Sequence, residues 1–375
     1  MKRVISALLL LSILLSGCGL LPASTEPTEQ PTEASAEATG NTEVTEPSTE
    51  PTQEPTEPPT EVPTEPPMLY HNPLTGEPLA EPYTGRPVAI SINNVKPAMP
   101  RHSVSQADVL YEMLVEGGLT RCLAIYSDLS DVQAIGSVRS ARNNFIDIAI
   151  SYNALFVHAG GSKYAYRMLN ETQWNHIDGI GSGLHGKFYR DQDRLNSGYS
   201  REHTLFTTGE GILFLADNRK FNMSLGEVDY GLQFAQEATP DGETAKRILV
   251  KFSSWNKRTY LTYYEEGTYH LTQYDKMVID GNTGLEEAYE NVFIIFAKHN
   301  LVDNRYQFAE LLGSGSGYYA CGGKLIKILW HHENAEDPIT YTLEDGTPLV
   351  QKIGRSYVAI VPTGSTVKWG DYDAF

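Results

Sequence analysis

The sequence predicts an α+β protein, with a mixed α/β N-terminal domain followed by a β-rich C-terminal domain. Between residues 88 and 170, apolar runs of strand length alternate with segments that have helical periodicity. From residue 245 onward, short runs rich in Val, Ile, Tyr and Thr are separated by turn signals that contain glycine. The 375 residues are enough for two domains of ordinary size.

The N-terminal domain is expected at residues 68–208. Its strands are expected to pair in part as a hairpin around Glu116-Gly117-Gly118. Its first helix is expected to start at Ser140, whose hydroxyl suits an N-cap. The expected elements are strands at 88–92, 109–115, 120–126 and 154–159, a helix at 140–152, and a second helix that Gly160-Gly161-Ser162 opens and that runs through Leu169.

A bridging segment at residues 209–243 joins the two domains, with one short apolar helix candidate at 211–218. The β-rich domain is expected at 244–375, and its short strands are expected to be antiparallel. The expected strands are 247–252, 258–263, 269–274, 291–296, 324–330 and 357–361.

The amino terminus predicts a lipoprotein signal peptide at residues 1–17. A basic start precedes a short apolar run, Val4 to Leu15, which is shorter than the roughly 20 residues that span a bilayer. Leu15-Ser16-Gly17-Cys18 resembles the bacterial lipobox, in which small residues precede a cysteine that is lipidated and becomes the amino terminus. Acyl chains such as palmitate on Cys18 would anchor the protein at the extracytoplasmic face of the cell membrane. The alternative is a cysteine that follows a signal peptide by chance.

Residues 18–67 combine this cysteine with a Thr/Glu/Pro tether that we expect to be disordered. Residues 19–67 hold eleven Glu and no Lys, Arg or Asp. With almost nothing apolar to bury, the stretch cannot offset the entropy of ordering. Proline and like-charge repulsion favour an extended chain. We interpret it as a plain spacer rather than as a glycosylated Thr-rich stalk.

The charge of the chain is unevenly distributed and argues against one class of partner. The formal net charge is -18, and from Met68 onward 27 basic and 36 acidic residues leave a net of -9. A protein that binds nucleic acid without sequence preference needs a basic face, so no nucleic-acid partner is expected. Three cysteines exclude a four-cysteine zinc site. Neither a cofactor nor a metal is expected.

Several strings, in this order along the chain, resemble the YerB-like family of bacterial lipoproteins, a two-domain family of unknown function. The resemblance covers roughly residues 70–362 and implies no established activity. The family usually has Pro-His-Asn near the end of its first domain, where this chain has Arg201-Glu202-His203-Thr204. The matching strings are Arg86-Pro-Val-Ala-Ile90 with Asn93-Asn94, Ser105-Gln-Ala-Asp-Val-Leu-Tyr-Glu112, Val115-Glu-Gly-Gly-Leu-Thr-Arg121, Gly136-Ser-Val-Arg-Ser-Ala-Arg142, His158-Ala-Gly-Gly-Ser162 and Tyr189-Arg190-Asp191.

Two helix-opening turns predict an anion-binding pocket. Arg139 and Arg142 flank the first turn, and arginine matches the geometry of carboxylate and phosphate. In the second turn, glycines allow a concave set of backbone N–H donors. A polar stretch around Arg190 either covers the pocket as a lid or is a solvent loop. The candidate ligand-binding residues are Arg121, Arg139, Ser140, Arg142, His158, Gly160, Gly161, Ser162 and Arg190.

The same residues have a structural alternative and a catalytic one. Arg139 and Arg142 could instead pair with Glu112 and Glu116 as a structural network. Two carboxylates with His158 could perform acid–base chemistry, and with His203 they could ligate a metal. The weak catalytic candidates are Glu112, Glu116, His158 and His203. Charged side chains on the solvent face of a hairpin are the commoner explanation.

The leading functional hypothesis is a membrane-tethered extracytoplasmic lipoprotein whose folded part is a non-catalytic binding module. Its ligand is expected to be an anionic component of the cell envelope, or its partner an envelope protein. The alternative is a cell-envelope hydrolase or transferase that uses His158 with Glu112 and Glu116. That alternative requires the imidazole and the carboxylates to approach within hydrogen-bond reach.

Overall fold

The computed structural model describes residues 70–253 and 258–375. The predicted signal peptide at 1–17, Cys18 and the tether at 19–67 therefore lie outside the described residues. Among the helices that the structure describes, none has the length and apolar character needed to cross a membrane.

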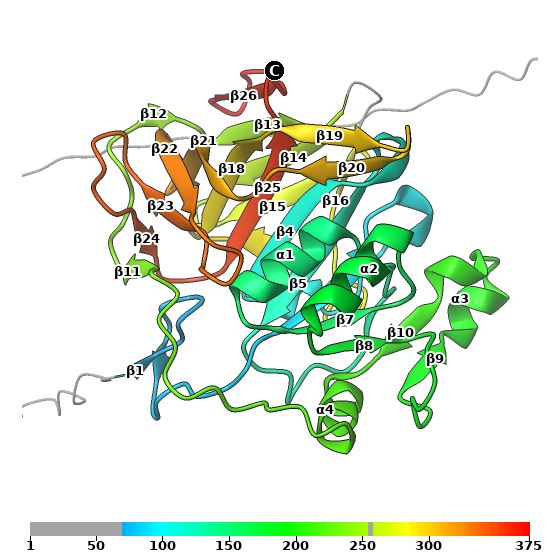
Figure 1. Cartoon of the computed structure of the whole chain (residues 1–375). Helices are drawn as coiled ribbons and strands as arrows, with labels where there is room; N and C mark the ends of the chain where they lie inside the picture. The colour runs from blue at the N-terminus through cyan, green and yellow to red at the C-terminus, as the bar shows by residue number, and fades with distance from the viewer. Residues whose placement is uncertain (1–69, 254–257) are drawn as a thin grey trace, which may run out of the picture. The chain divides into compact units, whose positions relative to one another are not determined.

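A mixed sheet of eleven strands forms the centre of the fold (Figure 1). Strand β23 (Thr340–Thr342) pairs with β22 beside the main path of the sheet. In sheet order the strands are β12 (Glu243–Thr244), β22 (Lys324–His332), β21 (Gly313–Cys321), β18 (Asn291–Ala297), β25 (Ser356–Pro362), β4 (Val109–Leu114), β5 (Thr120–Tyr126), β3 (Val88–Asn93), β7 (Leu155–His158) and β8 (His176–Asp178).

A second sheet of six strands comes from the carboxy-terminal part of the chain. Its strands are β16 (Lys276–Met277), β15 (Tyr269–Gln273), β14 (Arg258–Tyr263), β13 (Arg247–Lys251), β26 (Val367–Gly370) and β17 (Ala288–Tyr289). The smaller sheets pair β1 (Tyr70–His71) with β2 (Pro78–Leu79), β11 (Gln233–Ala235) with β24 (Val350–Lys352), β19 (His299–Val302) with β20 (Tyr306–Ala309), and β10 (Leu205–Thr207) with both β6 (Ile135–Gly136) and β9 (Phe188–Arg190).

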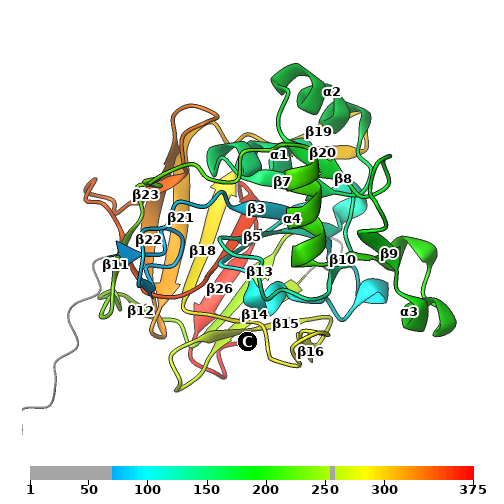
Figure 2. The same ribbon diagram turned by 90° about the horizontal axis from the view of Figure 1, so that it is seen from below.

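The two faces of the central sheet are covered by different elements (Figure 2). One face packs on the six-stranded sheet and on α4, because Leu110 and Ala124 share a core with Ile248 and Ile212. The other face packs on α1 and α2, whose apolar side chains join a second core. The α-helices are α1 (Asn143–Ser151), α2 (Lys163–Thr172), α3 (Gln192–Asn196) and α4 (Gly209–Asn218).

Strands from both predicted domains pair within the central sheet. The two described ranges belong to one compact unit, so the expected limits at 208 and 244 do not coincide with a break in the sheet. β25 lies between β18 and β4 and runs parallel to both. The expectation of antiparallel strands in the carboxy-terminal part is therefore wrong for the pairing of β18 with β25, whereas β18 with β21, and β13, β14 and β15, are antiparallel.

The apolar runs of the sequence coincide with the observed strands to within one or two residues. The nine-residue β21 of the central sheet was not expected, nor were the short strands outside those runs and the short helix α3. The first helix starts at Asn143 and not at Ser140. The reason is that the preceding residues are held in extended pairing: Arg139 N–H donates to Ser91 O at 2.8 Å, and Ala141 forms a bridge with Gly161.

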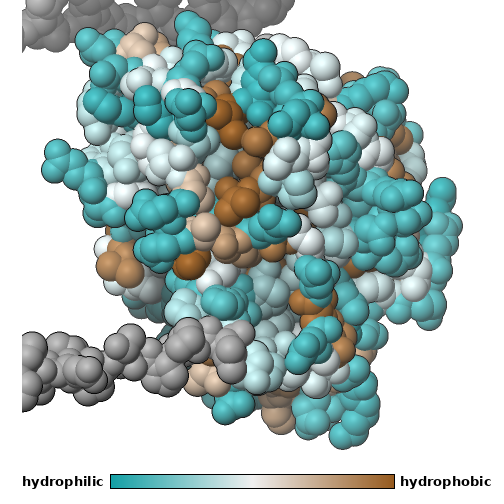
Figure 3. Space-filling view, turned by 90° about the vertical axis from the view of Figure 1, so that its left-hand side faces the viewer, coloured by the Kyte–Doolittle hydropathy of each residue, from teal (hydrophilic) through white to brown (hydrophobic). Residues whose placement is uncertain are grey.

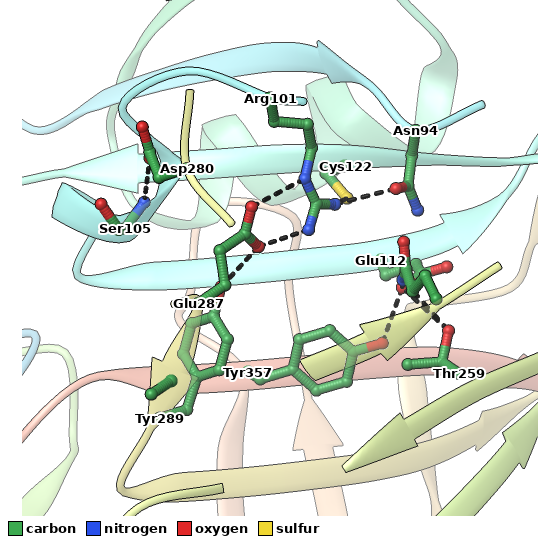
Figure 4. Close-up of polar contacts among 12 residues, drawn as sticks. Asn94, Arg101, Ser105, Glu112, Cys122, Thr259, Asp280, Glu287, Tyr289 and Tyr357 are labelled. Carbon is green, nitrogen blue, oxygen red and sulfur yellow. Dashed lines mark hydrogen bonds and ion pairs between the residues drawn. The ribbon is translucent and has the colours of Figure 1, made fainter. Parts of the chain in front are cut away.

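A fully buried ion pair connects the two halves of the chain (Figure 4). Arg101 donates to both carboxylate oxygens of Glu287, with Nε to Oε1 at 3.0 Å, and both side chains are at most 1% exposed. The Nη1 atom of Arg101 also donates to Asn94 Oδ1 at 2.8 Å and to Cys122 Sγ at 3.0 Å. Since a buried charge is tolerated only when it is paired and hydrogen-bonded, this pair fixes the position of residues 94–101 on the six-stranded sheet.

The neighbouring Asp280 reinforces the same connection. Its two carboxylate oxygens accept hydrogen bonds from the backbone N–H groups of Ser103 at 2.9 Å and Ser105 at 2.8 Å. The N–H of Gly281 donates to Arg101 O at 2.7 Å. These contacts join the two segments by directional bonds as well as by apolar packing.

Removing the carboxylate of Glu287 is predicted to destabilise the fold strongly. Glu287→Gln preserves volume but leaves the charge of Arg101 buried without its counter-ion, which costs roughly 3–5 kcal/mol. Urea denaturation of the chain from residue 18 onward, carrying Cys18→Ser so that it is unlipidated, measures the free energy of unfolding. This form is called the unlipidated protein below.

Two further variants make this measurement decisive. Replacing both charges, as Arg101→Met with Glu287→Leu, is expected to cost less than Glu287→Gln, because no unpaired charge is left buried. Glu286→Gln removes a carboxylate whose side chain is 44% exposed and serves as the matched control. An equal loss for Glu286→Gln and Glu287→Gln would contradict the account.

Candidate functional site

The two turns predicted to form a pocket lie side by side. The N–H of Ala141 donates to Gly160 O at 2.8 Å, and the N–H of Ala159 donates to Arg139 O at 2.8 Å. Both turns lie on the face of the central sheet that carries α1 and α2, because each leads directly into one of these helices. The structure therefore brings the residues at 139–142 and 158–162 together, as the sequence predicted.

The two helices begin differently. The hydroxyl of Ser162 accepts a hydrogen bond from the N–H of Ala165 at 3.0 Å, which confirms Ser162 as the N-cap of α2. Ser140 is not a cap. Its carbonyl instead accepts from Arg121 Nη1 at 2.6 Å, while Arg142 stands at the N-cap of α1 without a capping side chain and no acidic residue occupies the first turn. The amino terminus of α1 thus keeps its partial positive charge without a side-chain acceptor.

Five guanidinium groups gather beside these turns, and we call them the arginine cluster. Two ion pairs hold part of it: Arg142 pairs with Glu116, and Arg139 pairs with Glu202 at 3.1 Å. The cluster consists of Arg121, Arg139, Arg142, Arg190 and Arg201.

Mutual repulsion within the cluster is visible in the pKa values of its arginines. Burial, and then the charges of Arg142 and Arg139, lower the pKa of Arg121 well below its usual range. Burial, and then Arg201 and Arg139, lower the pKa of Arg190. Burial alone would raise the pKa of Glu116, but the charge of Arg142, its hydrogen bond, a backbone hydrogen bond and the charge of Arg121 together outweigh burial and lower that pKa. The arrangement favours an additional negative charge.

Some donors of the cluster have no acceptor. Arg121 is only 6% exposed, and its Nη1 donates to the neutral carbonyl of Ser140 rather than to a carboxylate. The Nε atoms of Arg139 and Arg142 are buried and have no hydrogen-bond partner among the described residues. Buried donors without acceptors are uncommon in native proteins and call for an explanation such as an ion or water.

The glycine turn contributes less than the sequence predicted. The N–H of Gly160 donates to Asp178 Oδ1 at 2.8 Å, and the N–H of Ser162 points to Ala141 O at 3.4 Å. These donors are satisfied inside the protein. The expectation that Gly160 and Gly161 present a concave set of free N–H groups is therefore wrong for Gly160, and the side chains of the arginines supply the positive character of the site.

His158 is buried in a network that its own turn creates. Its Nδ1 lies 2.8 Å from Gly160 O and its Nε2 lies 2.9 Å from His176 Nδ1. Because a carbonyl can only accept, Nδ1 of the neutral ring carries the proton and Nε2 accepts from His176. Burial lowers the pKa of His158 to about 4. The neutral imidazole thus supports the turn and is fully enclosed.

Glu112 lies on the opposite face of the sheet from His158. Residues of β4 alternate between faces, and Glu112 follows the face of Leu110 and Leu114, which pack toward the six-stranded sheet. Its carboxylate accepts from Thr120 Oγ1 at 2.7 Å, Gln273 Nε2 at 2.7 Å and Tyr357 Oη at 2.8 Å. Figure 4 shows it beside the ion pair of Arg101. His158 instead stacks on Phe156, in the core beneath α1 and α2.

The catalytic candidates are therefore not assembled into one site. Glu116 pairs with Arg142, and the Nδ1 of His203 lies 2.9 Å from Asn93 Nδ2. The predicted pairing of the arginines with Glu112 is wrong, because Glu112 and the cluster lie on different faces of the central sheet. The predicted pairing of Arg142 with Glu116 is confirmed. In the two described ranges no group of three or more His, Cys, Asp or Glu side chains is placed to hold a metal ion.

Sequence reasoning missed four residues of this region. Arg201 and Glu202 lie on the short 3-10 turn at Arg201–His203. The departure of this segment from the family pattern was the available signal for both. His176 and Asp178 lie on β8, a strand too short to be recognised from periodicity.

Two family models match this chain, one in each half. Residues 74–222 match the family model described as "Protein of unknown function (DUF3048) N-terminal domain", and residues 248–358 match the corresponding C-terminal domain. The chain belongs to this YerB-like family of unknown function, as the sequence motifs predicted.

Similarity to YerB of Bacillus subtilis, in sequence and in structure, agrees with this placement. The Bacillus subtilis (strain 168) protein named "Putative lipoprotein YerB" is 28% identical over 296 residues, covering 77% of this chain and 86% of the relative. The crystal structure of YerB protein from Bacillus subtilis has a TM-score of 0.69 at 26% identity, covering 80% of this chain and 99% of that chain. This similarity supports a sheet-rich, two-domain fold and a lipoprotein.

Acidification is predicted to remove stability through His158. Its folded pKa of about 4 lies below the ordinary 6.5, so the unfolded chain binds a proton first as the pH falls. The stabilisation is complete above pH 6.5 and is lost as the pH falls from 6.5 toward 4, by roughly 3 kcal/mol in total. Urea denaturation across this range should show a smaller decline for His158→Gln than for the unsubstituted protein.

The matched control is the exposed His185, whose substitution as His185→Gln should leave the decline unchanged. An NMR titration of the imidazole of His158 in the intact protein reads the same pKa directly. A midpoint near 6.5 would contradict the buried neutral ring.

Proposed function

We propose that the folded part of this lipoprotein is a non-catalytic module that binds an anionic group, a phosphate or a carboxylate of a cell-envelope component, at the arginine cluster. The observation that carries this proposal is the imbalance of charge: five guanidinium groups share two ion-paired carboxylates. A bound anion would supply the missing negative charge and accept hydrogen bonds that the protein leaves unmade.

Three features of the site support an anion over a neutral ligand. The unpartnered Nε atoms of Arg139 and Arg142 are donors only. The neighbouring amino terminus of α1 has no capping side chain, and its dipole favours negative charge. Arg139 and Arg190 are partly exposed, so a ligand can reach them from solvent. Glu112 and His158 lie on opposite faces of the central sheet, so they do not form the acid–base pair that hydrolysis or group transfer through them would need, which favours binding.

Inorganic phosphate is predicted to raise the melting temperature of the unlipidated protein above its value in chloride of equal ionic strength. A ligand at ten times its dissociation constant stabilises the folded state by about 1.4 kcal/mol. The double variant Arg139→Gln with Arg190→Gln should lose this increase and keep its melting temperature in chloride. Succinate in place of phosphate tests whether a carboxylate ligand gives the same response.

The control variant is Arg167→Gln with Arg258→Gln, two exposed arginines outside the cluster. It should keep the full response to phosphate. If phosphate stabilises every variant equally, or none, the cluster is only a structural network of charges.

The anchoring of this module is proposed from the sequence and from the name of its relative. Cleavage after residue 17 and acylation of Cys18, with palmitate among the acyl chains, would hold the protein on the extracytoplasmic face of the cell membrane. Three acyl chains exceed the two signals that stable anchoring requires. The acidic tether would place the binding module away from the lipid surface.

Cys18→Ser is predicted to release the protein from the membrane. Expression in Bacillus subtilis with radiolabelled palmitate should label the unsubstituted protein and place it in the membrane fraction. The substituted protein should be unlabelled and should leave that fraction. Ser16→Thr retains the cysteine and controls for general effects of substitution near the cleavage site. Membrane retention of unlabelled Cys18→Ser protein would contradict lipid anchoring.

A further inference from the structure

A groove lies at the edge of the central sheet where β12 and β22 meet, away from the arginine cluster. Its volume is about 920 Å³, and it is bounded by the segment 237–243, by β22 and by the loop at 343–350. Its floor is apolar and includes Leu325, Ile326 and Leu343. Figure 3 views the side of the molecule that carries β12, β22 and β24, and apolar surface there lies between hydrophilic borders.

The backbone of β22 is open within this groove. On its outer edge, Lys324 and Leu325 pair with β12, while residues 329–331 pair with β23. Between these two pairings, residues 326–328 have no strand partner on that edge anywhere in the described ranges. The edge is thus interrupted for three residues, where an added strand would complete the ladder.

The orientation of the backbone shows which groups are available. Leu325 pairs with Glu243 of β12, and its carbonyl oxygen would lie 2.3 Å from a Cβ added to Gly242, so the backbone of residue 325 faces the outer edge. Alternate residues of an antiparallel strand direct their backbone groups to the same edge. The N–H and C=O of Lys327 therefore face the groove. The adjacent residues Ile326 and Ile328 direct their backbone groups to the other edge of β22, where β21 pairs with it.

The rim of the groove is strongly acidic, which defines the kind of partner. Lys327 is the one basic residue among those that line it, whereas five carboxylates do so: Glu237, Asp241, Glu243, Glu344 and Asp345. The chain's own tether at 19–67, with eleven Glu and no basic residue, is repelled by this rim. A second copy would bring the same acidic rim and is disfavoured for the same reason.

We propose that this groove binds an extended, basic segment of a partner polypeptide, which adds as a short strand to residues 326–328 of β22. Its backbone pairs with Lys327, its apolar side chains occupy the floor, and its Lys or Arg side chains meet the carboxylates of the rim. Main-chain hydrogen bonds supply affinity in this mode of recognition, and the alternating side chains supply specificity. This surface uses no residue of the arginine cluster, so it stands independently of the proposed function.

The experiment uses the unlipidated protein and a fluorescent, acetylated heptapeptide of alternating lysine and valine, with the glutamate–valine heptapeptide as the charge control. Fluorescence polarisation should show binding of the lysine peptide only. Asp241→Lys with Glu344→Lys is expected to weaken binding by about tenfold or more, because like charges then face each other. Glu171→Lys with Glu227→Lys, two exposed sites elsewhere, should leave the affinity unchanged.

A second pair of variants tests the backbone. Lys327→Pro removes the backbone N–H that faces the groove and is expected to abolish binding. Lys327→Met keeps that N–H and removes the one positive charge of the rim, so it is expected to retain or improve binding. If Lys327→Pro does not fold, hydrogen exchange in the unsubstituted protein decides: the amide of Lys327 should gain protection with the lysine peptide.

Three results of the binding and exchange experiments would overturn the proposal. These are equal binding of the glutamate peptide, unchanged affinity after charge reversal at Asp241 and Glu344, and an amide of Lys327 that gains no protection in the complex. Sedimentation that shows a dimer disrupted by the same charge reversal would assign the groove to contacts between copies of the chain, and would overturn it as well.

Discussion

The pairing of β25 with β4 is the constraint on which the rest of the structure depends. β25 comes from near the end of the chain, yet it lies parallel to β4 over Ser356 to Ile360 and parallel to β18 on its other side. The sheet is therefore complete only when both family segments are in place. This pairing holds the hairpin of β4 and β5 at the centre of the sheet. The hairpin carries Glu112 on one face of the sheet and Arg121 on the other.

The two faces use buried charge in opposite ways. Toward the six-stranded sheet, Arg101 is matched by Glu287, and Glu112 is surrounded by hydroxyl and amide donors. Toward the helices, the arginine cluster has more positive charge than its carboxylates neutralise. Since burying a charge without a partner is costly, the first arrangement stabilises the fold, whereas the second is what a site for an external anion requires.

The sequence predicted local features well and long-range ones poorly. Most of the longer strands followed from apolar periodicity, but β21, which begins with alternating Gly and Ser, did not. The cap at Ser162 followed from residue type and position. Ser140 failed as a cap because extended pairing of residues 139–141 with other segments, which no local pattern encodes, delays the helix. The partners of Glu112 and of Arg101 come from distant parts of the chain, so spacing could not find them. The motif order did predict the family, because it depends on residue identity and not on distance in space.

The most direct test of the account is where an anion binds in a crystal of the unlipidated protein. Tungstate is a tetrahedral oxyanion like phosphate, and its anomalous scattering locates it without ambiguity. The account predicts a tungsten peak within hydrogen-bond reach of at least two guanidinium groups of the arginine cluster, and no such peak in the Arg139→Gln with Arg190→Gln variant. The account would be contradicted if no tungstate bound at the arginine cluster and every guanidinium group donated to a carboxylate or carbonyl of the protein itself.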